Sequence, residues 1–269
     1  MTFTEHRRLL TRMIVVNIVN TVAYRADFVM FMLGTILSPV ISLLVWRAAI
    51  ANGAELPISE TYLTSYFVVL AVVSMLTSAW LSGFLASAIR NGGLSVWLAR
   101  PGSFLYELAA NNISEKTFKC MVLLPMVVIF GFIFRAQVSL STSALHWVLC
   151  LVSVTLGAVM FFCLDVMEGS LAFWLEEVSG IVAVRHLLML VLAGQLVPLA
   201  LMPDWAQAFL FFQPFRYLLS FPIELVVADL NRAEITLGLT VQVAWTVALV
   251  LGSRWVWGRG QRAYSAVGA

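Results

Sequence analysis

Charged side chains are scarce in this chain, and most of the closely spaced carboxylates lie in one segment. Asp165 and Glu168 are three residues apart, a spacing that places them on one face of a helix. Two interpretations remain open for this pair: a solvated acidic helix end, or a polar lining of an inward-facing cavity opposite Arg185. The first is favoured, because buried carboxylates are rare without a partner.

No familiar catalytic pattern accompanies these carboxylates. The sequence contains no P-loop and no GxSxG, HExxH or SxxK pattern. Its three cysteines, Cys120, Cys150 and Cys163, lie in apolar surroundings without metal-ligand spacing, which is typical of small buried hydrophobes. The sequence therefore predicts a protein that is not an enzyme and holds no cofactor or metal of its own.

The composition indicates a membrane protein. Of 269 residues, 61% are hydrophobic and only 11% are charged, whereas a soluble domain has about 25% charged residues. Mean hydropathy is +0.95. The apolar runs are long enough for helices rather than barrel strands. A soluble enzyme, a nucleic-acid binder and a disordered scaffold are excluded together.

Six stretches with little or no charge predict six transmembrane helices in an all-α integral membrane protein. The third is short, so Thr117, Phe118 and the stem of Lys119 are expected to extend it. The N-terminal residues 1–26 are basic and amphipathic, and no removable signal peptide is expected. The predicted spans are 28–46, 61–89, 120–134, 136–164, 178–202 and 235–253.

The placement of Lys and Arg predicts that both termini are cytoplasmic. In this orientation twelve basic residues lie inside and four lie outside, which is the asymmetry that the positive-inside rule describes. The four on the outside are Arg47, Arg135, Arg216 and Arg232.

Residues 90–118 form a semi-apolar inner loop between the second and third predicted spans. Two breakers, Gly92-Gly93 and Pro101-Gly102, enclose a short segment that is expected to form a helix at the membrane surface. A plain interfacial loop is the alternative, but the length and the two breakers favour a docking element. The candidate docking residues are Gly92, Gly93, Leu94, Trp97, Leu98, Arg100 and Pro101.

Residues 203–232 form an outer segment that is too apolar for a solvent loop and too interrupted to span. Pro203, Pro214 and Pro222 cut it into short pieces, which predicts re-entrant or interfacial helices. Its aromatic residues are expected in the belt at the outer headgroups. They are Trp205, Phe211, Phe212, Phe215, Tyr217 and Phe221.

Gln195 is a polar residue within the fifth predicted span. It follows Gly194 and precedes Pro198, so a break in the helix is expected there. Its amide could line a pathway or could bond to a neighbouring helix, and both interpretations stay open.

Residues 194–230 resemble the type-two ABC permease superfamily, in its branch of small six-span subunits of uncharacterised exporters. The resemblance covers most of the chain and rests on the order of several short motifs. These are Trp97-Leu98-Ala99-Arg100-Pro101, Leu171-Ala172-Phe173-Trp174, Pro198, Met202-Pro203-Asp204-Trp205, Pro214-Phe215-Arg216-Tyr217 and Phe221-Pro222.

The resemblance implies a dimeric permease in a bacterial inner membrane. Residues 1–26 would form an amphipathic helix at the inner surface, and the inner loop would hold a coupling helix that docks on a separate ATPase. Two ATPase copies would bind ATP and Mg, and the second permease would be another copy or a dissimilar paralogue. The outer segment would close the pathway as an external gate, through Pro203, Trp205, Pro214, Phe215, Arg216, Tyr217 and Pro222.

Three other functions were weighed against this one. A secondary transporter or channel would show inverted repeats or charged residues in mid-span, and neither is evident. An enzyme acting on lipid would need an acid, base or nucleophile set, and the only carboxylate cluster includes Asp165, Glu168, Glu176 and Glu177 without a recognisable companion. A non-transporting subunit of a membrane assembly stays open.

The charge asymmetry generates a topological prediction. A cysteine introduced at Gly53 or Asp229 should react with an impermeant thiol reagent from outside intact cells, and one at Ser103 should not. The reverse labelling pattern would invert the topology and remove the docking assignment of the inner loop.

Overall fold

The computed structural model describes residues 11–12, 15–17, 25–98, 104–133 and 136–264, and every regular element within them is a helix. Within this described part of the chain, four stretches are long and apolar enough to cross a bilayer, and Ser179–Leu192 (α8) is a shorter apolar helix. The predicted all-α membrane fold is therefore confirmed, whereas the count of six spans stays a prediction. The four stretches are Gly34–Ala51, Glu60–Arg90, Ala144–Phe173 and Arg232–Ala263.

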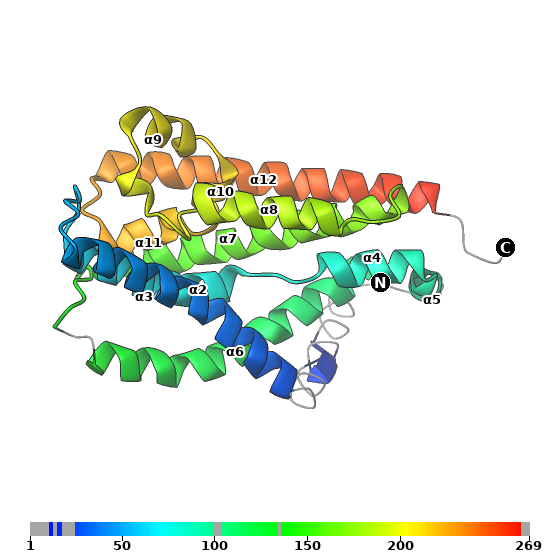
Figure 1. The fold of residues 1–269 in the computed structure, drawn as a ribbon. Helices are drawn as coiled ribbons and strands as arrows, with labels where there is room; N and C mark the ends of the chain where they lie inside the picture. Colours follow the sequence, from blue (N-terminus) through cyan, green and yellow to red (C-terminus); the bar gives the residue numbers. More distant parts are fainter. Residues whose placement is uncertain (1–10, 13–14, 18–24, 99–103, 134–135, 265–269) are drawn as a thin grey trace.

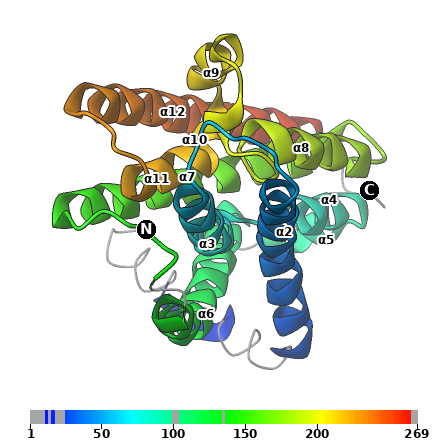
Figure 2. The same cartoon turned by 60° about the vertical axis from the view of Figure 1, so that its left-hand side comes forward.

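The long helices run between two ends of the molecule (Figure 1). The α9 end carries the short helices of the outer segment, and the α5 end carries the short helix of the inner loop and the last turns of α12. Figure 2 shows α2 and α6 extending away from α12. The helices are α2 (Arg25–Ala51), α3 (Glu60–Thr77), α4 (Ser82–Arg90), α5 (Gly93–Leu98), α6 (Phe104–Ile133), α7 (Ala144–Ser170), α8, α9 (Asp204–Phe211), α10 (Pro214–Leu218), α11 (Ser220–Val227) and α12 (Arg232–Ala263), with 3-10 turns η1 (Leu171–Phe173) and η2 (Leu199–Leu201).

Helix α7 is the centre of the packing. It contacts α3, α4, α10, α11 and α12. Two apolar clusters form along it. The membrane cluster, which includes Tyr66, Met160 and Phe221, lies towards the α9 end. The α5 cluster, which includes Leu94 and Trp257, lies towards the α5 end.

The second predicted span, 61–89, is not one helix. Helix α3 ends at Thr77 and α4 begins at Ser82, with four non-helical residues between them. An 18-residue helix such as α3 is about 27 Å long, which nearly matches the hydrocarbon thickness of about 30 Å. On its own α3 is therefore nearly long enough to cross the layer, and the candidate span Glu60–Arg90 continues past the break into α4.

Residues 104–118, which were expected in the inner loop, form the first half of α6. Phe104 and Leu108 lie one helical turn apart and are both buried in the α5 cluster, so packing extends the helix into this segment. Lys119, whose stem was expected to extend the third span, lies within α6, and its side chain is fully buried. The expected N-terminal amphipathic helix, 1–26, lies largely outside the described residues.

The fifth predicted span, 178–202, is interrupted as the Gly194–Pro198 pattern indicated. Helix α8 ends at Leu192, and Gly194 adopts a φ of +78°, which favours glycine. The predicted break is thus confirmed, and a continuous helix to Met202 is wrong. The fourth span begins later than predicted, at Ala144, and the sixth is longer, because a capping box of Asn231 and Glu234 starts α12 at Arg232.

The close approach of α11 to α12 generates a prediction about stability. A Cβ built on Gly238 would overlap the buried ring of Phe221, whereas a Cβ on Gly258 of the same helix would meet nothing within 4 Å. Gly238→Ala should therefore destabilise the protein by about 1–3 kcal/mol. Gly258→Ala should be neutral or slightly stabilising. Thermal unfolding of the two purified variants in the same detergent measures the difference, and equal unfolding temperatures would contradict the tight packing of α11 on α12.

Candidate functional site

The break between α3 and α4 leaves peptide groups without helical partners, and charged side chains from other helices bind them. The Lys116 ammonium donates to the Ser78 carbonyl oxygen (2.9 Å), and the Lys119 ammonium donates to the Ser78 hydroxyl (2.9 Å). On the far side of the break, Asp165 Oδ2 accepts a hydrogen bond from the Leu81 N–H (2.7 Å). Helices α6 and α7 thus supply the bonds that the interrupted helix lacks.

Asp165 and Glu168 both pair with Arg185 of α8. The Asp165 Oδ1 atom lies 2.7 Å from Arg185 Nη2, and Glu168 Oε1 lies 2.6 Å from Arg185 Nε. All three side chains are buried. The two carboxylates therefore face Arg185, and the interpretation of a solvated helix end does not hold. Their role in lining a pathway stays a prediction.

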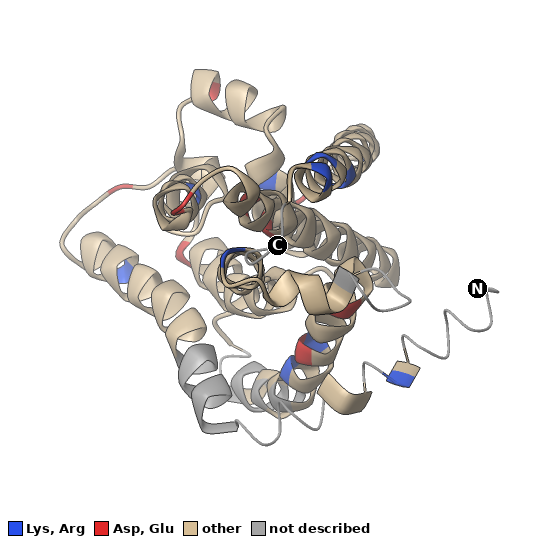
Figure 3. Cartoon of the chain, turned by 90° about the vertical axis from the view of Figure 1, so that its right-hand side faces the viewer, with Lys and Arg blue, Asp and Glu red and all other residues tan. Residues whose placement is uncertain are grey.

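We call this group the ionic junction: Ser78, Glu115, Lys116, Lys119, Asp165, Glu168 and Arg185. Glu115 joins it through an ion pair of 2.5 Å with Lys119, one helical turn away. The junction has three acidic and three basic residues, so their formal charges cancel. This balance matters because an uncompensated charge in such surroundings is costly. Figure 3 shows how few charged residues the helices carry elsewhere.

The ionic junction lies between the two apolar clusters. Met75 and Thr77 of α3 are buried on one side of the break, and Leu81 and Leu85 of the α5 cluster are buried on the other. Asp165 likewise lies between Phe161 of the membrane cluster and Val166 of the α5 cluster. The junction is therefore one contact between the α5 cluster and the long helices, beside the direct packing of Val166 of α7 and Trp257 of α12 in that cluster.

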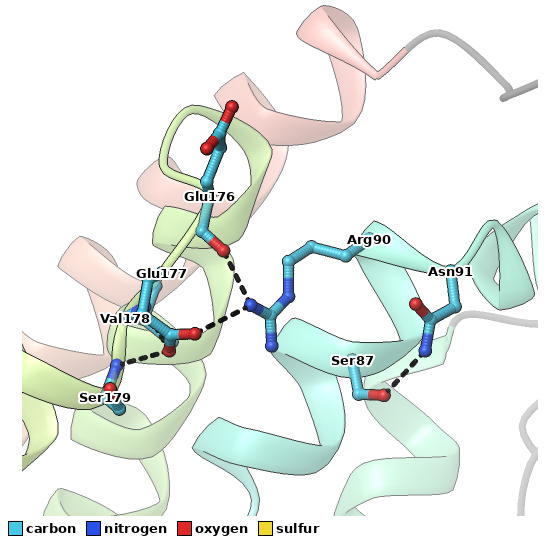
Figure 4. A network of polar contacts seen from close by, with 7 residues as sticks. All are labelled: Ser87, Arg90, Asn91, Glu176, Glu177, Val178 and Ser179. Atoms are coloured by element: carbon cyan, nitrogen blue, oxygen red, sulfur yellow. Dashed lines mark hydrogen bonds and ion pairs between the residues drawn. The ribbon is translucent and has the colours of Figure 1, made fainter.

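A second contact ties the end of α4 to the start of α8 (Figure 4). Arg90 Nη1 donates to the Glu176 carbonyl oxygen (2.6 Å) and pairs with Glu177 Oε2 (3.2 Å). Glu177 Oε1 accepts from the N–H groups of Val178 and Ser179, both at 3.0 Å. The Ser179 N–H, and then Arg90, lower the pKa of Glu177 to about 2. Glu177 is therefore ionised at neutral pH and suits the N-terminus of α8.

The structure shows α5 within the predicted docking loop. Gly92, with a φ of +72°, turns the chain after α4 into α5. Leu94 is fully buried, and the Trp97 ring lies 5.4 Å from that of Phe104, so both residues anchor α5 to the α5 cluster. Val96 is the apolar side chain that points outward, with 56% of its surface exposed. Arg100 and Pro101 lie outside the described residues, as does the side chain of Leu98.

The outer segment forms three short helices, and each of them has a proline directly before it or in its first turn. Pro203 precedes α9, Pro214 is the first residue of α10, and Pro222 is in the first turn of α11. Trp205 is 76% exposed, which suits a headgroup belt. Tyr217, like Phe221, is buried, so the belt interpretation is wrong for these two residues. They belong to the membrane cluster because α10 and α11 pack on α7.

A second buried polar group, which we call the outer network, holds α10 and α11 to α3. Arg216 pairs with Glu224 Oε2 (2.6 Å), and Ser220 donates to Glu224 Oε1 (2.8 Å). The Tyr66 hydroxyl lies 3.1 Å from the Ser220 hydroxyl and donates to the Gly194 carbonyl oxygen (3.0 Å). Sequence analysis missed Tyr66 and Glu224, although an isolated Glu within an apolar segment was a usable signal.

A cavity of about 350 Å³, the side cavity, lies between these two polar groups. Helices α2, α3, α7 and α8 and the turn after α8 form its wall. Gln195 and Arg185 both line it. Asp165 and Glu168 are not among the described residues of the wall. They pair with Arg185, which does line the cavity.

A bundle of long apolar helices with a broken span and a charge-balanced buried junction defines an all-α membrane protein. The particular family follows from comparison with known families. The chain belongs to the ABC-2 family of transporter proteins, whose family model matches residues 36–268. This confirms the type-two ABC permease resemblance. No curated protein matches the chain.

Members of this family are the membrane component of ABC transporters and generally work with an ATPase subunit. The chain is therefore a membrane-embedded ABC transporter permease. The ionic junction is the feature that sequence analysis found only in part: it singled out Asp165, Glu168 and Arg185 but not Ser78 or the two lysines. Two cations three residues apart, directly before an apolar run, were the available signal for Lys116 and Lys119.

The junction generates a prediction that separates buried from exposed ion pairs. Asp165→Asn should destabilise the protein by about 3–5 kcal/mol, because it leaves the charge of Arg185 poorly compensated in a buried site. The double variant Asp165→Asn with Arg185→Gln should recover part of that loss. Unfolding in detergent, followed for both single variants and the double variant, gives the coupling energy.

The matched control is the exposed pair of Arg47 and Glu60, whose atoms lie 3.0 Å apart. Removing that pair should cost about 0–1 kcal/mol. Additive effects at Asp165 and Arg185 would show that these residues do not interact in the folded protein.

Proposed function

We propose that this permease is the membrane subunit of an exporter and that α5 is the element on which a separate ATPase docks. The observation that carries the proposal is the position of α5 within this ABC-2 family chain. It lies at one end of the bundle, exposes Val96, and connects directly through α4 to the ionic junction.

The contacts of α4 supply a route for the movement. When two ATPase subunits close on ATP, they displace α5, and α4 moves with it because Gly92 joins them in a tight turn. Helix α4 reaches α7 through the Leu81–Asp165 bond and α8 through Arg90. The energy of ATP binding shifts the permease only if its two states contact the closed ATPase differently.

The external gate remains the proposed role of the outer segment. Its seven candidate residues lie on or beside α9, α10 and α11, at the end of the molecule opposite α5. The ion pair of Arg216 with Glu224 joins α10 to α11 and would hold this gate closed. Opening at this end requires the α10–α11 pair to move relative to α3 or α7.

The proposed assembly contains two permeases and two ATPase subunits in a bacterial inner membrane, with both termini of this chain in the cytoplasm. The second permease is either another copy or a dissimilar paralogue. ATP and Mg bind to the ATPase, and the cargo crosses from the cytoplasm outward. The basic-residue asymmetry supports the orientation, because it assigns the α5 end to the cytoplasm.

This proposal predicts that α5 holds the ATPase by its exposed face. Val96→Asp should weaken co-purification of the ATPase from native membranes at least about tenfold, since it places a charge in an apolar contact. Trp97→Ala should weaken it too, together with protein stability, because Trp97 packs on Phe104.

The control is Ala54→Asp, in the exposed turn after α2 at the opposite end. It should leave ATPase association unchanged. If Val96→Asp and Ala54→Asp retain the same amount of ATPase, α5 is not the docking element.

A further inference from the structure

The side cavity is polar at its α5-side end, has aliphatic side chains along its middle, and is lined by Gln195 beyond the end of α8. Along α3, Ser78 lies eight residues beyond Leu70, or about 12 Å nearer to the α5 end, and both line the cavity. Along α8, which runs in the opposite sense, Arg185 lies one helical turn nearer to the α5 end than Met189. The hydroxyl of Ser78 and the guanidinium of Arg185 thus lie at one end, and aliphatic side chains occupy the middle.

The charges around the polar end restrict what could bind there. Arg185 is the charged residue among the described residues of the wall, and its guanidinium already pairs with Asp165 and Glu168. The ionic junction behind it carries as many acidic as basic residues. A ligand that brought a further charge of either sign would leave that charge uncompensated in a buried site, which is costly. Hydrogen-bonding groups without charge meet no such penalty.

The volume of the side cavity and the residues of its wall are suited to one small ligand. Cavities that bind small molecules are about 300–1,000 Å³, mostly apolar, with a few polar groups that orient the ligand. The side cavity, at about 350 Å³, falls at the lower end of this range. Its apolar wall between Leu70, Phe161 and Met189 suits an aliphatic tail.

We propose that the side cavity binds an uncharged amphiphile, with its polar head near Ser78 and Arg185 and its tail between Leu70 and Met189. This inference rests on the proposed function, since it names the class of cargo that the exporter would carry. A head of this kind donates hydrogen bonds to the hydroxyl oxygens of Ser74 and Ser78, whose own protons go to the carbonyl oxygens of Ala71 and Met75. It does not disturb the ion pairs of Arg185.

The test uses three probes that share an octyl tail carrying a diazirine: octyl glucoside, octyl phosphate and octyltrimethylammonium. Each is photolysed with the full-length protein in phosphatidylcholine vesicles, and labelled residues are mapped by mass spectrometry. Exposed α12 residues such as Leu237 and Val247 report simple partition into the bilayer. The expected result is that the ratio of labelling at Leu70 and Met189 to labelling on α12 is about tenfold higher for the glucoside than for either charged probe.

A variant that fills the cavity provides the matched control. Ser38 of α2 lines the side cavity and is exposed, so Ser38→Phe narrows the cavity without overpacking a core. Its neighbour Leu37 is 56% exposed and not on the described wall. With octyl glucoside, Ser38→Phe should lower the ratio of cavity labelling to α12 labelling to the value found with the charged probes. Leu37→Phe should leave that ratio unchanged.

Each other outcome is decisive. Equal ratios for the three probes, a preference for a charged probe, or no effect of Ser38→Phe would overturn the uncharged-amphiphile site. None of these results affects ATPase association, which is measured separately. If labelling is selective as expected but the ATPase never co-purifies, the proposed exporter function fails while the binding site stands.

Discussion

The structure depends on one constraint: a helix that stops inside an apolar bundle must have its free peptide groups bonded by something other than water. The chain between Thr77 and Ser82 meets this constraint with charged side chains. Lys116 binds the carbonyl side of the break, and Asp165 binds the N–H side. Each of these charges then needs an opposite charge, which fixes the neighbouring helices as well. The break in the second span and the packing of α6, α7 and α8 around it therefore depend on one another.

The same constraint explains why the ionic junction suits a coupling role. Complete, it is close to neutral in its effect on stability, but the loss of one member costs several kcal/mol. It therefore resists partial rearrangement and favours movement of the attached helices as a unit. Because α4 and α5 share the apolar cluster on one side of the junction, force applied to α5 reaches α7 through short, stiff contacts. Arg90 adds a parallel connection to the residues that directly precede α8.

Features that depend on local residue patterns could be predicted from the sequence, and features that depend on tertiary contacts could not. Rare carboxylates in an apolar stretch singled out Asp165, and the glycine and proline around Gln195 indicated the end of α8. The break after Thr77 had no such signal, because the residues there include neither Gly nor Pro. Its cause is the bonding partners that α6 and α7 offer. The sequence therefore did not predict the partners of Ser78 either, including the bond that the Lys119 ammonium donates to its hydroxyl.

Helix α8 and the turn after it contact both buried polar groups, the ionic junction and the outer network. Its middle joins the ionic junction through Arg185, and the turn that follows it joins the outer network through the Gly194 carbonyl oxygen. Between these points α8 is packed sparsely: of its 14 residues only Arg185 and Met189 are buried. A displacement of α8 therefore sacrifices little apolar burial, and its cost is concentrated in a few polar contacts at known places. Since α8 also forms one wall of the side cavity, a change in either polar group alters the shape of the space in which a cargo would sit.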